Sequence, residues 1–480
     1  MSINLVAKPE DRGNLIRQAL RSLRAGWQGI AGARYDAAAA SMRPDLPGDD
    51  LEPLRQQMRA CLEGRGGEVS ARARAAALGR AYLTLDPTGR ERFLRVLAVD
   101  FDIAEAEVSA AIDALKAAQS LEERNRTRQR LRATLEPPRV KLLTQFNSLP
   151  QGIKFLVNMR AELLPLGRKD PALALLADDL RVLLATWFDV DFLELRRITW
   201  DTASGALLEK LIAYEAVHPI ESWDDLKNRL DYDRRYFAYF HPRMPDEPLI
   251  FVEVALVKGM ADNVQNLLDP KAPPQDPKTA DAAIFYSISN AQRGLDGISF
   301  GNFLIKRVVG ELSHEFPNIK TFATLSPIPG FVHWLDLALS EGRPGLLKPA
   351  DRKTLTALGV TKGAKGWLRQ TLAGSDWHHN EALLKTLRPL LFRLCAQYLA
   401  REQRSGGTAL DPVAHFHLSN GALMDRLNWM ADRSKRGLRH SAGLMINYRY
   451  DLAKIEENHE LYRSSGKRAL SPGIRGLLSG

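Results

Sequence analysis

A serine held between rigid backbone positions is the first feature of this 480-residue chain that could do chemistry. In the segment "FATLSPIPGFVHW", Ser326 stands directly before Pro327, and Pro329 and Gly330 follow. A proline disfavours helical angles at the preceding residue and fixes its own φ, so Ser326 is expected to end an extended segment before a tight turn at Gly330. Such a serine suits catalysis. From this stretch alone a helix cap is favoured, since Ser-Pro is a common helix start and "FVHWLDLAL" is typical of a helix.

A strand, a glycine-bearing loop and a helix are expected in "FYSISNAQRGLDGISFGNFLIKRVV". Gly294, Gly297 and Gly301 let backbone N–H groups approach an anion, and the start of the helix adds a favourable dipole. The spacing matches neither G-x-x-x-x-G-K-[ST] nor G-x-G-x-x-G, so it specifies neither a nucleoside triphosphate nor a dinucleotide. The segment is therefore a pyrophosphate cradle or an ordinary loop. Lys306 and Arg307 behind it are phosphate ligands or solvated helix residues.

Two histidines lie two residues apart in "DPVAHFHLSNGA". On a strand, His415 and His417 would share one face, as a pair of zinc ligands could, but no third ligand stands nearby. A single histidine could instead act as a general acid or base, or be a hydrogen-bonded residue at a strand end. In "GLMINYRYDL", Tyr448 and Tyr450 alternate as packing residues of a strand do, and a tyrosine hydroxyl at the strand end could complete a polar site.

The elements that must position these residues change character near residue 187. Up to about residue 185 the chain is rich in Ala, Leu and Arg, and its apolar residues recur at three- and four-residue intervals, which predicts amphipathic helices. The segments "RPDLPGDD", "DPTG" and "EPP" predict breaks between them. This half has no evident catalytic cluster, so we expect it to serve packing and oligomerisation.

The second half is typical of a mixed α/β domain. The apolar runs "YFAYFH", "LIFVEVALV" and "TADAAIFYSIS" predict strands, and "LDPKAPPQDPKTAD" predicts a mobile surface loop. Helices are predicted for "NFLIKRVVGELSHEF", "NEALLKTLRPLLFRLCAQYLA" and "GALMDRLNWMADRS".

Composition limits the class of protein and of partner. The formal charge of +10 indicates an anionic partner, which could be nucleic acid, acidic lipid or a phosphorylated cofactor. Cys61 and Cys395 are too few and too far apart for a disulfide framework or a metal site, which favours a reducing compartment. With no apolar run of membrane-spanning length and no secretory signal, we expect a cytoplasmic protein that does not bind membranes.

Seven motifs occur in one order between residues 187 and 455: "VHPI", "FYSIS", "GLDGISFGNFLIKRVV", "LSPIPGF", "PVAHFHLSNGA", "NWMADRSKRG" and "GLMINYRY". Together they resemble the malonyl-CoA decarboxylase family. The resemblance implies an α-helical N-terminal domain for oligomerisation over residues 1–186. It also implies an α/β, GNAT acyltransferase-like catalytic domain over residues 187–480 that binds the coenzyme A thioester.

The resemblance also implies a site. Ser326 and His417 fall on the family's catalytic pair, described as proton acceptor and proton donor, and both are expected to contact the substrate. The other substrate-binding positions fall on Asp296, Gly297, Ile298, Ser299, Phe300, Gly301 and Asn302, supported by the polar residues Ser287 and Tyr450. Animal members carry a glutamate where this chain has Ser299, so a role of that carboxylate does not transfer.

The implied reaction converts malonyl-CoA to acetyl-CoA and carbon dioxide through an enolate, which needs hydrogen-bond donors at the thioester oxygen and an acid near the α-carbon. The thioester is the electron sink, so no metal and no organic cofactor are expected. By the resemblance the chain is a homotetramer, joined non-covalently because cysteines that link some eukaryotic subunits have no counterpart. Fatty-acid turnover and malonate use are both compatible pathways.

Two rival functions use other features of the sequence. An acyl-CoA acyltransferase would share the cradle but need a second pocket for its acceptor. A basic scaffold or nucleic-acid-binding protein would bind DNA or RNA in a strongly salt-dependent way, but the positive residues are spread along the chain and no nucleic-acid-binding motif is present, so no nucleic-acid partner is expected.

Overall fold

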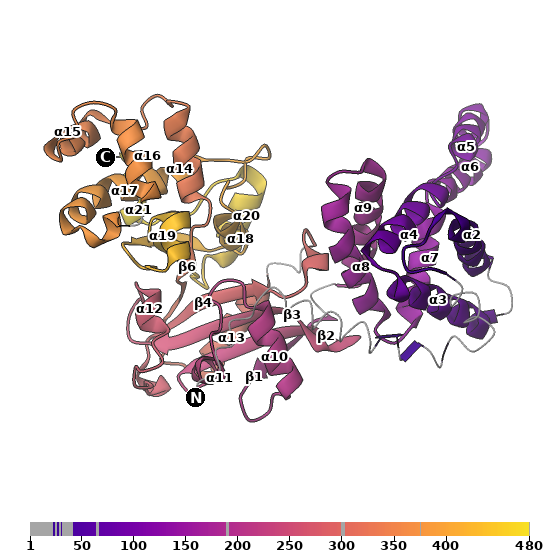
Figure 1. The fold of residues 1–480 in the computed structure, drawn as a ribbon, viewed down its shortest axis with the longest axis horizontal. Coiled ribbons are helices and arrows are strands. Elements are labelled where there is room, and N and C mark those ends of the chain that lie inside the picture. The colour runs from indigo at the N-terminus through magenta and orange to yellow at the C-terminus, as the bar shows by residue number, and fades with distance from the viewer. Residues whose placement is uncertain are drawn as a thin grey trace.

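The fold consists of a helical part, a central sheet and a second group of helices, arranged along one long axis (Figure 1). The computed structural model describes residues 42–63, 67–188, 192–298, 303–374 and 376–479, together with residues 23, 24, 26, 27 and 30. The predicted fold class, helical first and mixed α/β afterwards, is confirmed. No helix within the described ranges is both long and apolar enough to span a bilayer.

Three helices of the helical part begin at the breaks that the sequence predicts: α2 (Gly48–Leu62), α4 (Pro87–Asp100) and α7 (Pro138–Gln145). Asp86 and Asp170 cap α4 and α9, each with proline at the first helical position. Residues 105–134 form two helices and not one, because Ser120 forms a capping box with Glu123 and starts the second. The helices are α2 (Gly48–Leu62), α3 (Gly67–Thr84), α4 (Pro87–Asp100), α5 (Glu105–Ala117), α6 (Leu121–Thr134), α7 (Pro138–Gln145), the 3-10 turn η1 (Phe146–Ser148), α8 (Gly152–Gly167) and α9 (Pro171–Ala185).

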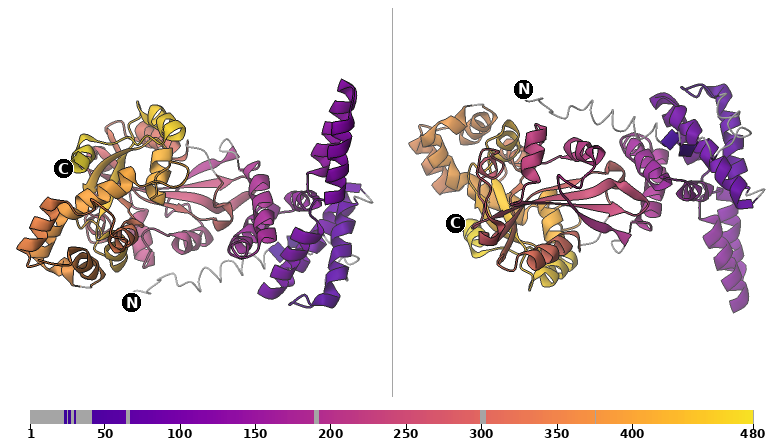
Figure 2. Two further views of the ribbon diagram at one scale, coloured as in Figure 1. Left: turned by 90° about the horizontal axis from the view of Figure 1, so that it is seen from above. Right: turned by 90° about the horizontal axis from the view of Figure 1, so that it is seen from below.

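Helices α5 and α6 form a hairpin that projects away from the rest of the molecule (Figure 2). No residue of α6 is buried, and Leu121 and Leu135 at its two ends are exposed. An exposed helix pair of this kind gains little stability from the chain to which it belongs.

Eight strands form one mixed sheet. They are β1 (Glu194–Ile198), β2 (Arg234–His241), β3 (Met244–Val257), β4 (Ala282–Asn290), β5 (Thr321–Thr324), β6 (Ser326–Pro327), β7 (Leu423–Asn428) and β8 (Met445–Arg449). Their order is β1-β2-β3-β4-β5-β8-β6, with β7 also paired to β8, and only β4 and β5 are parallel within the described sheet. The three strands predicted from apolar runs are confirmed as β2, β3 and β4.

Helices cover the sheet on both faces, because alternate residues of a strand point to opposite sides. Tyr236 and Phe240 of β2 pack with α10, whereas Phe237 and Tyr239 belong to the large core that includes α13. The remaining helices are α10 (Gly205–Tyr214), α11 (Trp223–Arg229), α12 (Val264–Leu267), η3 (Pro277–Thr279), η4 (Arg293–Leu295), α13 (Phe303–Glu315), α14 (Phe331–Ser340), α15 (Pro349–Ala357), α16 (Ala364–Ala373), η5 (Trp377–His379), α17 (Glu381–Arg401), α18 (Pro412–Ser419), α19 (Lys435–Ser441), α20 (Ile455–Ser465) and α21 (Pro472–Ser479).

One predicted helix of this part is wrong. The segment "GALMDRLNWMADRS" contains strand β7, which pairs antiparallel with β8. Its Ala, Leu, Met and Arg residues favour a helix locally, but pairing with β8 overrides that preference. Gly421, with φ of +77°, makes the turn into the strand. The helices predicted at α13, α14 and α17 are confirmed, and the Pro/Lys/Asp segment lies exposed between β3 and β4 with only the turn η3 in it.

The pairing between β4 and β5 ends part of the way along the strands, and this creates a cavity in the sheet. Their last parallel pair is Phe285 with Thr324. At the same level β4 has a bulge against β3, which leaves Tyr286 as an extra residue. Beyond this point Ser326 pairs with Ile446 of β8. The two strands therefore part, and side chains line the space between them.

Helix α8 of the helical part holds the glycine loop that follows β4. The buried guanidinium group of Arg160 donates hydrogen bonds to the carbonyl oxygens of Gly294 and Asp296, at 2.6 and 2.9 Å. The buried ammonium group of Lys154 donates to Oε1 of Gln292 at 2.7 Å. The backbone of the loop is thus fixed by side chains that lie more than 130 residues earlier in the chain.

We expect Gly294→Ala to lower the free energy of unfolding by about 1–3 kcal/mol, the usual cost of overpacking. A Cβ atom at Gly294 would lie 1.8 Å from the carbonyl oxygen of Val157 on α8, so one of the two backbones must move. Gly310→Ala is the control, because an added Cβ on this exposed residue of α13 meets open space in the described structure. Urea unfolding measures both proteins, and a Gly294→Ala protein as stable as its parent would contradict the close contact.

Candidate active site

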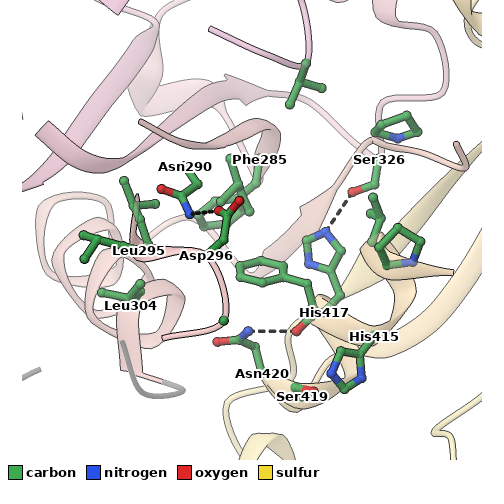
Figure 3. A pocket seen from close by; sticks show the side chains of 18 of the residues that line it. Phe285, Asn290, Leu295, Asp296, Leu304, Ser326, His415, His417, Ser419 and Asn420 are labelled. Carbon is green, nitrogen blue, oxygen red and sulfur yellow. Dashed lines mark hydrogen bonds between the residues drawn. The ribbon is translucent and has the colours of Figure 1, made fainter. Parts of the chain in front are cut away.

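A cavity of about 600 Å³ lies where β4 and β5 part (Figure 3). Apolar side chains form most of its wall, and polar groups converge on it from β6, α18 and the loop after β4. The apolar lining includes Val217, Ile250, Phe285, Ile288, Leu295, Ile298, Leu304 and Phe416, and the polar lining includes Asn290, Asp296, Ser326, His415, His417, Ser419, Asn420 and Arg463. A mostly apolar hollow with a few converging polar groups is typical of a ligand site.

A chain of hydrogen bonds stands in the wall of this cavity. Oγ of Ser326 lies 3.0 Å from Nε2 of His417, and Ser326 donates to Oγ1 of Thr324 at 2.8 Å. The dashed line in Figure 3 marks the contact between Ser326 and His417. On the far side of the imidazole, Nδ1 of His417 lies 2.8 Å from the hydroxyl of Tyr450. Ser326 and His417 are 5% and 3% exposed, so the chain is shielded from bulk water.

Ser326 occupies a strand and caps no helix. It lies in β6, and this confirms the extended conformation predicted before Pro327. The alternative prediction, that Ser326 caps a helix, is wrong. The N-cap of α14 is Gly330, with φ of −96°. Gly330 is needed for space, because a Cβ atom there would lie 2.1 Å from the hydroxyl oxygen of Tyr398.

His417 lies on a helix, where the sequence suggested a strand. Asp411 caps α18 by accepting hydrogen bonds from the N–H groups of Val413 and Ala414, and proline takes the first helical position. On a helix, residues two apart point in different directions. His415 therefore turns to Tyr462, at 2.9 Å, while His417 turns to Ser326. Among the described residues no group of three or more His, Cys, Asp or Glu side chains is arranged to hold a metal ion.

The surroundings of His417 keep its imidazole neutral. Burial lowers the pKa of His417 to about 3, and burial also raises the pKa of Tyr450 far above its usual value. The ring of Tyr448 stacks on the imidazole with ring centres 4.5 Å apart, which fixes the plane of the ring. At neutral pH the site therefore holds an uncharged histidine and an uncharged tyrosine.

The glycine loop reaches the cavity through Asp296, Gly297 and Ile298, all of which line it. Nδ2 of Asn290 donates to Oδ1 of Asp296 at 3.4 Å, and partial burial raises the pKa of this carboxyl group. The predicted substrate-binding residues Ser299, Phe300, Gly301 and Asn302 lie outside the described residues. Behind the loop, Lys306 forms an ion pair with Glu456, and Arg307 donates to the carbonyl oxygen of Leu193.

Ser287 and Tyr450 stand behind the wall of the cavity and are absent from its described lining. Tyr450 contacts His417 directly. The hydroxyl of Ser287 instead donates to the carboxylate of Glu215, at 2.8 and 3.0 Å from its two oxygens. The same carboxylate accepts the backbone N–H groups of Val217 and His218, both at 2.7 Å. Glu215 thus ties the "VHPI" segment, which supplies part of the wall, to β4.

The sequence reasoning missed three of these residues. Thr324 stands two residues before Ser326, and the period of a strand places both on one face, so the pattern contained this signal. Arg160 falls on the apolar face of α8 with Leu156 and Leu163, where a charged residue requires buried partners. Nothing local indicates that Glu215 would meet β4.

A buried Ser–His–Tyr chain in the wall of an apolar cavity, where a mixed sheet parts, is an arrangement typical of an enzyme site. Comparison with known proteins gives the family. The family description "Malonyl-CoA decarboxylase C-terminal domain" matches residues 191–480, and "Malonyl-CoA decarboxylase N-terminal domain" matches residues 101–188. The chain therefore belongs to the malonyl-CoA decarboxylase family, whose activity is that of a carboxy-lyase.

Individual relatives match along most of the chain. Two are named malonyl-CoA decarboxylase, mitochondrial: the protein of Anser anser anser is 38% identical over 93% of this chain and 91% of its own length, and that of Mus musculus is 35% identical over 94% and 92%. The crystal structure of malonyl-CoA decarboxylase from Rhodopseudomonas palustris is 41% identical, with a TM-score of 0.81 over 89% of this chain and 99% of its own.

We expect the buried neutral His417 to make the protein lose stability in acid. Its pKa of about 3 in the folded chain lies below the value of about 6.5 in an unfolded chain. Between these values the unfolded chain binds a proton that the folded chain does not, so stability falls as pH drops below about 6.5, by about 1.4 kcal/mol per pH unit.

Urea unfolding between pH 7 and 4 tests this expectation. His417→Gln removes the group and should flatten the pH dependence relative to the parent, whereas His314→Gln, which changes an exposed histidine of α13, is the control. The same slope in all three proteins would contradict a neutral His417.

We expect Tyr450→Phe to lower kcat for carbon dioxide release from malonyl-CoA by about tenfold, the value of one lost hydrogen bond to the imidazole. Tyr448→Phe is the matched comparison. It keeps the ring that stacks on His417 and removes a hydroxyl that is buried without a hydrogen-bond partner in the described structure. The decrease in kcat of Tyr448→Phe should therefore be smaller than that of Tyr450→Phe. Equal losses in steady-state assays would show that the hydroxyl of Tyr450 has no special role.

Proposed function

We propose that the cavity binds the thioester end of malonyl-CoA and that Ser326 and His417 catalyse its decarboxylation. The observation that carries this proposal is the 3.0 Å contact between Oγ of Ser326 and Nε2 of His417 in the wall of a cavity of about 600 Å³. A hydroxyl and an imidazole nitrogen that share one hydrogen bond can act as a relay, in which the hydroxyl donates to a developing enolate oxygen or to a nearby carbon while it accepts from the imidazole.

The reaction breaks the bond between the α-carbon and the carboxyl carbon of malonyl-CoA. Carbon dioxide leaves, and the electron pair stays on the α-carbon and the thioester oxygen as an enolate. A proton then adds to the α-carbon to give acetyl-CoA, and one proton from solvent restores the enzyme. Because the thioester carbonyl accepts the electron pair, the proposed reaction needs no metal and no organic cofactor.

His417 is the proposed proton donor, and Ser326 is proposed to orient the substrate and to take part in the proton transfer. A neutral imidazole N–H is a weak acid, but an enolate of a thioester is a strong base, so the transfer runs downhill. Placement matters more than acid strength here, since a shift of about 1 Å can cost roughly a hundredfold in rate. The strand pairing of Ser326 and the ring stacking on His417 supply that placement.

Several of the proposed binding residues lie in the wall of the same cavity. Asp296, Gly297 and Ile298 line it, and Ser299, Phe300, Gly301 and Asn302 follow them directly in the sequence. The proposed supporting roles of Ser287 and Tyr450 are indirect, through Glu215 and through His417. Arg463, exposed at the rim, is placed to attract the anionic groups of coenzyme A.

The proposal also covers the oligomeric state of the enzyme, its location in the cell and its pathway. We propose that residues 1–186 join subunits non-covalently into a homotetramer and that residues 187–480 bind the substrate. The projecting α5–α6 hairpin, in which α6 buries no residue, supports a partner for the helical part, and both cysteines are free and buried. A cytoplasmic location remains a prediction, although the names of the vertebrate relatives place those proteins in mitochondria. Fatty-acid turnover and malonate use remain the candidate pathways.

The test incubates the purified protein with malonyl-CoA, without metal or acyl acceptor, and follows acetyl-CoA by mass spectrometry. We expect His417→Ala to lower kcat at least about a hundredfold and Ser326→Ala at least about tenfold, as loss of a general acid and of its partner predicts. Ser340→Ala on α14 and His314→Gln on α13 change exposed residues away from the cavity and serve as controls.

The outcomes separate the alternatives. Activity that survives both substitutions would leave the family intact and overturn the assignment of these two residues. A well-folded parent that forms no acetyl-CoA, but releases free coenzyme A when an amine or alcohol is added, would instead support an acyltransferase.

A further inference from the structure

Thr324 stands next to the proposed catalytic pair and has no assigned role. Its hydroxyl oxygen accepts the hydrogen bond of Ser326 at 2.8 Å, and the side chain is buried. We propose that Thr324 is a positioning residue that sets the direction of the hydrogen bonds around His417, so that the imidazole carries its proton on Nε2. This inference rests on the proposed function of Ser326 and His417 and deepens it.

Strand β8 fixes Thr324 from two sides. The backbone N–H of Tyr448 donates to the hydroxyl oxygen of Thr324 at 3.1 Å. The buried side chain of Asn447 donates to its carbonyl oxygen at 2.7 Å. The hydroxyl oxygen of Thr324 therefore has a fixed place, and it presents an acceptor to Ser326.

The direction of the chain follows from counting hydrogens. Ser326 has one hydroxyl hydrogen, and it points to Thr324. The oxygen of Ser326 then faces Nε2 of His417 with a lone pair only, so Nε2 must supply the hydrogen of the 3.0 Å contact. A neutral imidazole carries one hydrogen, which leaves Nδ1 as an acceptor for the hydroxyl of Tyr450 at 2.8 Å.

Every hydrogen in this chain points the same way. Tyr450 donates to His417, His417 donates to Ser326, and Ser326 donates to Thr324. The acidic hydrogen of the imidazole is thereby on the side of Ser326, which lines the cavity, while Tyr450 lies behind it. If Thr324 offered no acceptor, Ser326 would turn its hydrogen to Nε2, and the imidazole hydrogen would move to Nδ1 and point away from the substrate.

Thr324→Val tests this inference, because valine keeps the shape of threonine and removes the acceptor. Thr324→Ser keeps the hydroxyl and is the rescue variant. Thr321→Val makes the same substitution on the same strand outside the site and is the control. Thermal unfolding of all three shows whether each protein folds.

The first readout is the tautomer of His417 in protein with ¹⁵N-labelled histidine. Two-bond ¹H–¹⁵N spectra distinguish a protonated from an unprotonated ring nitrogen, and His417→Gln identifies the signal among the 10 histidines of the chain. We expect hydrogen on Nε2 in the parent, in Thr324→Ser and in Thr321→Val, and hydrogen on Nδ1 in Thr324→Val. This measurement needs no substrate, so it separates failure of the inference from failure of the proposed function.

The second readout is the kinetics of malonyl-CoA decarboxylation. We expect Thr324→Val to lower kcat at least tenfold with KM within about twofold of the parent, and Thr324→Ser to restore most of kcat. An unchanged tautomer in a folded Thr324→Val protein would overturn the inference. So would an equal loss of kcat in Thr324→Ser, because a purely structural role depends on the lost methyl group and not on the hydroxyl.

Discussion

Backbone groups of a strand must find hydrogen-bond partners. Beyond Phe285 and Thr324, β4 and β5 no longer pair with each other, and each keeps the neighbour on its other side. From there β4 continues beside β3, and the chain after β5 continues beside β8. The cavity between them is therefore made without leaving a strand unpaired. The separation also decides which side chains face it: Ser326 comes from one edge, the glycine loop follows from the other, and α18 brings His417 across the opening.

The helical part contributes to the site as well as to its own core. The carbonyl oxygens of Gly294 and Asp296 accept hydrogen bonds from the buried guanidinium group of Arg160 on α8. Burying this charged group without such partners would cost several kcal/mol. Arg160 therefore needs the loop as much as the loop needs Arg160. The large hydrophobic core runs through both parts without interruption, so the glycine loop stands on a support that includes α8. Loss of the helical part would thus remove one wall of the loop.

Sequence alone predicted what depends on local backbone chemistry. Pro327 forces Ser326 into an extended conformation, and this holds in β6. The alternatives failed where a distant segment decides: the pairing of β6 with β8 takes the hydroxyl of Ser326 away from a helix cap, and the same β8 turns the predicted helix after Gly421 into β7. The helix of His417 could have been predicted, because Asp411 followed by proline is a helix start. The contacts of His417 with Ser326 and Tyr450 join residues 91 and 33 positions apart, which no local pattern contains.

If the cavity binds malonyl-CoA as proposed, the lack of charge on its buried side chains favours the loss of carbon dioxide. Burial lowers the pKa of His415 as well as that of His417, and Arg463 is exposed at the rim, so the described lining offers no buried cation to the substrate carboxylate. A cation there would stabilise the carboxylate before reaction and so raise the barrier to its loss. A neutral N–H donor binds the carboxylate weakly. It becomes more effective when charge gathers on the thioester oxygen of the enolate, so its stabilisation grows towards the transition state. The hydrogen-bond donor of the site must therefore be uncharged. The apolar wall, the burial of His417 and the uncharged Tyr450 behind it all keep it so.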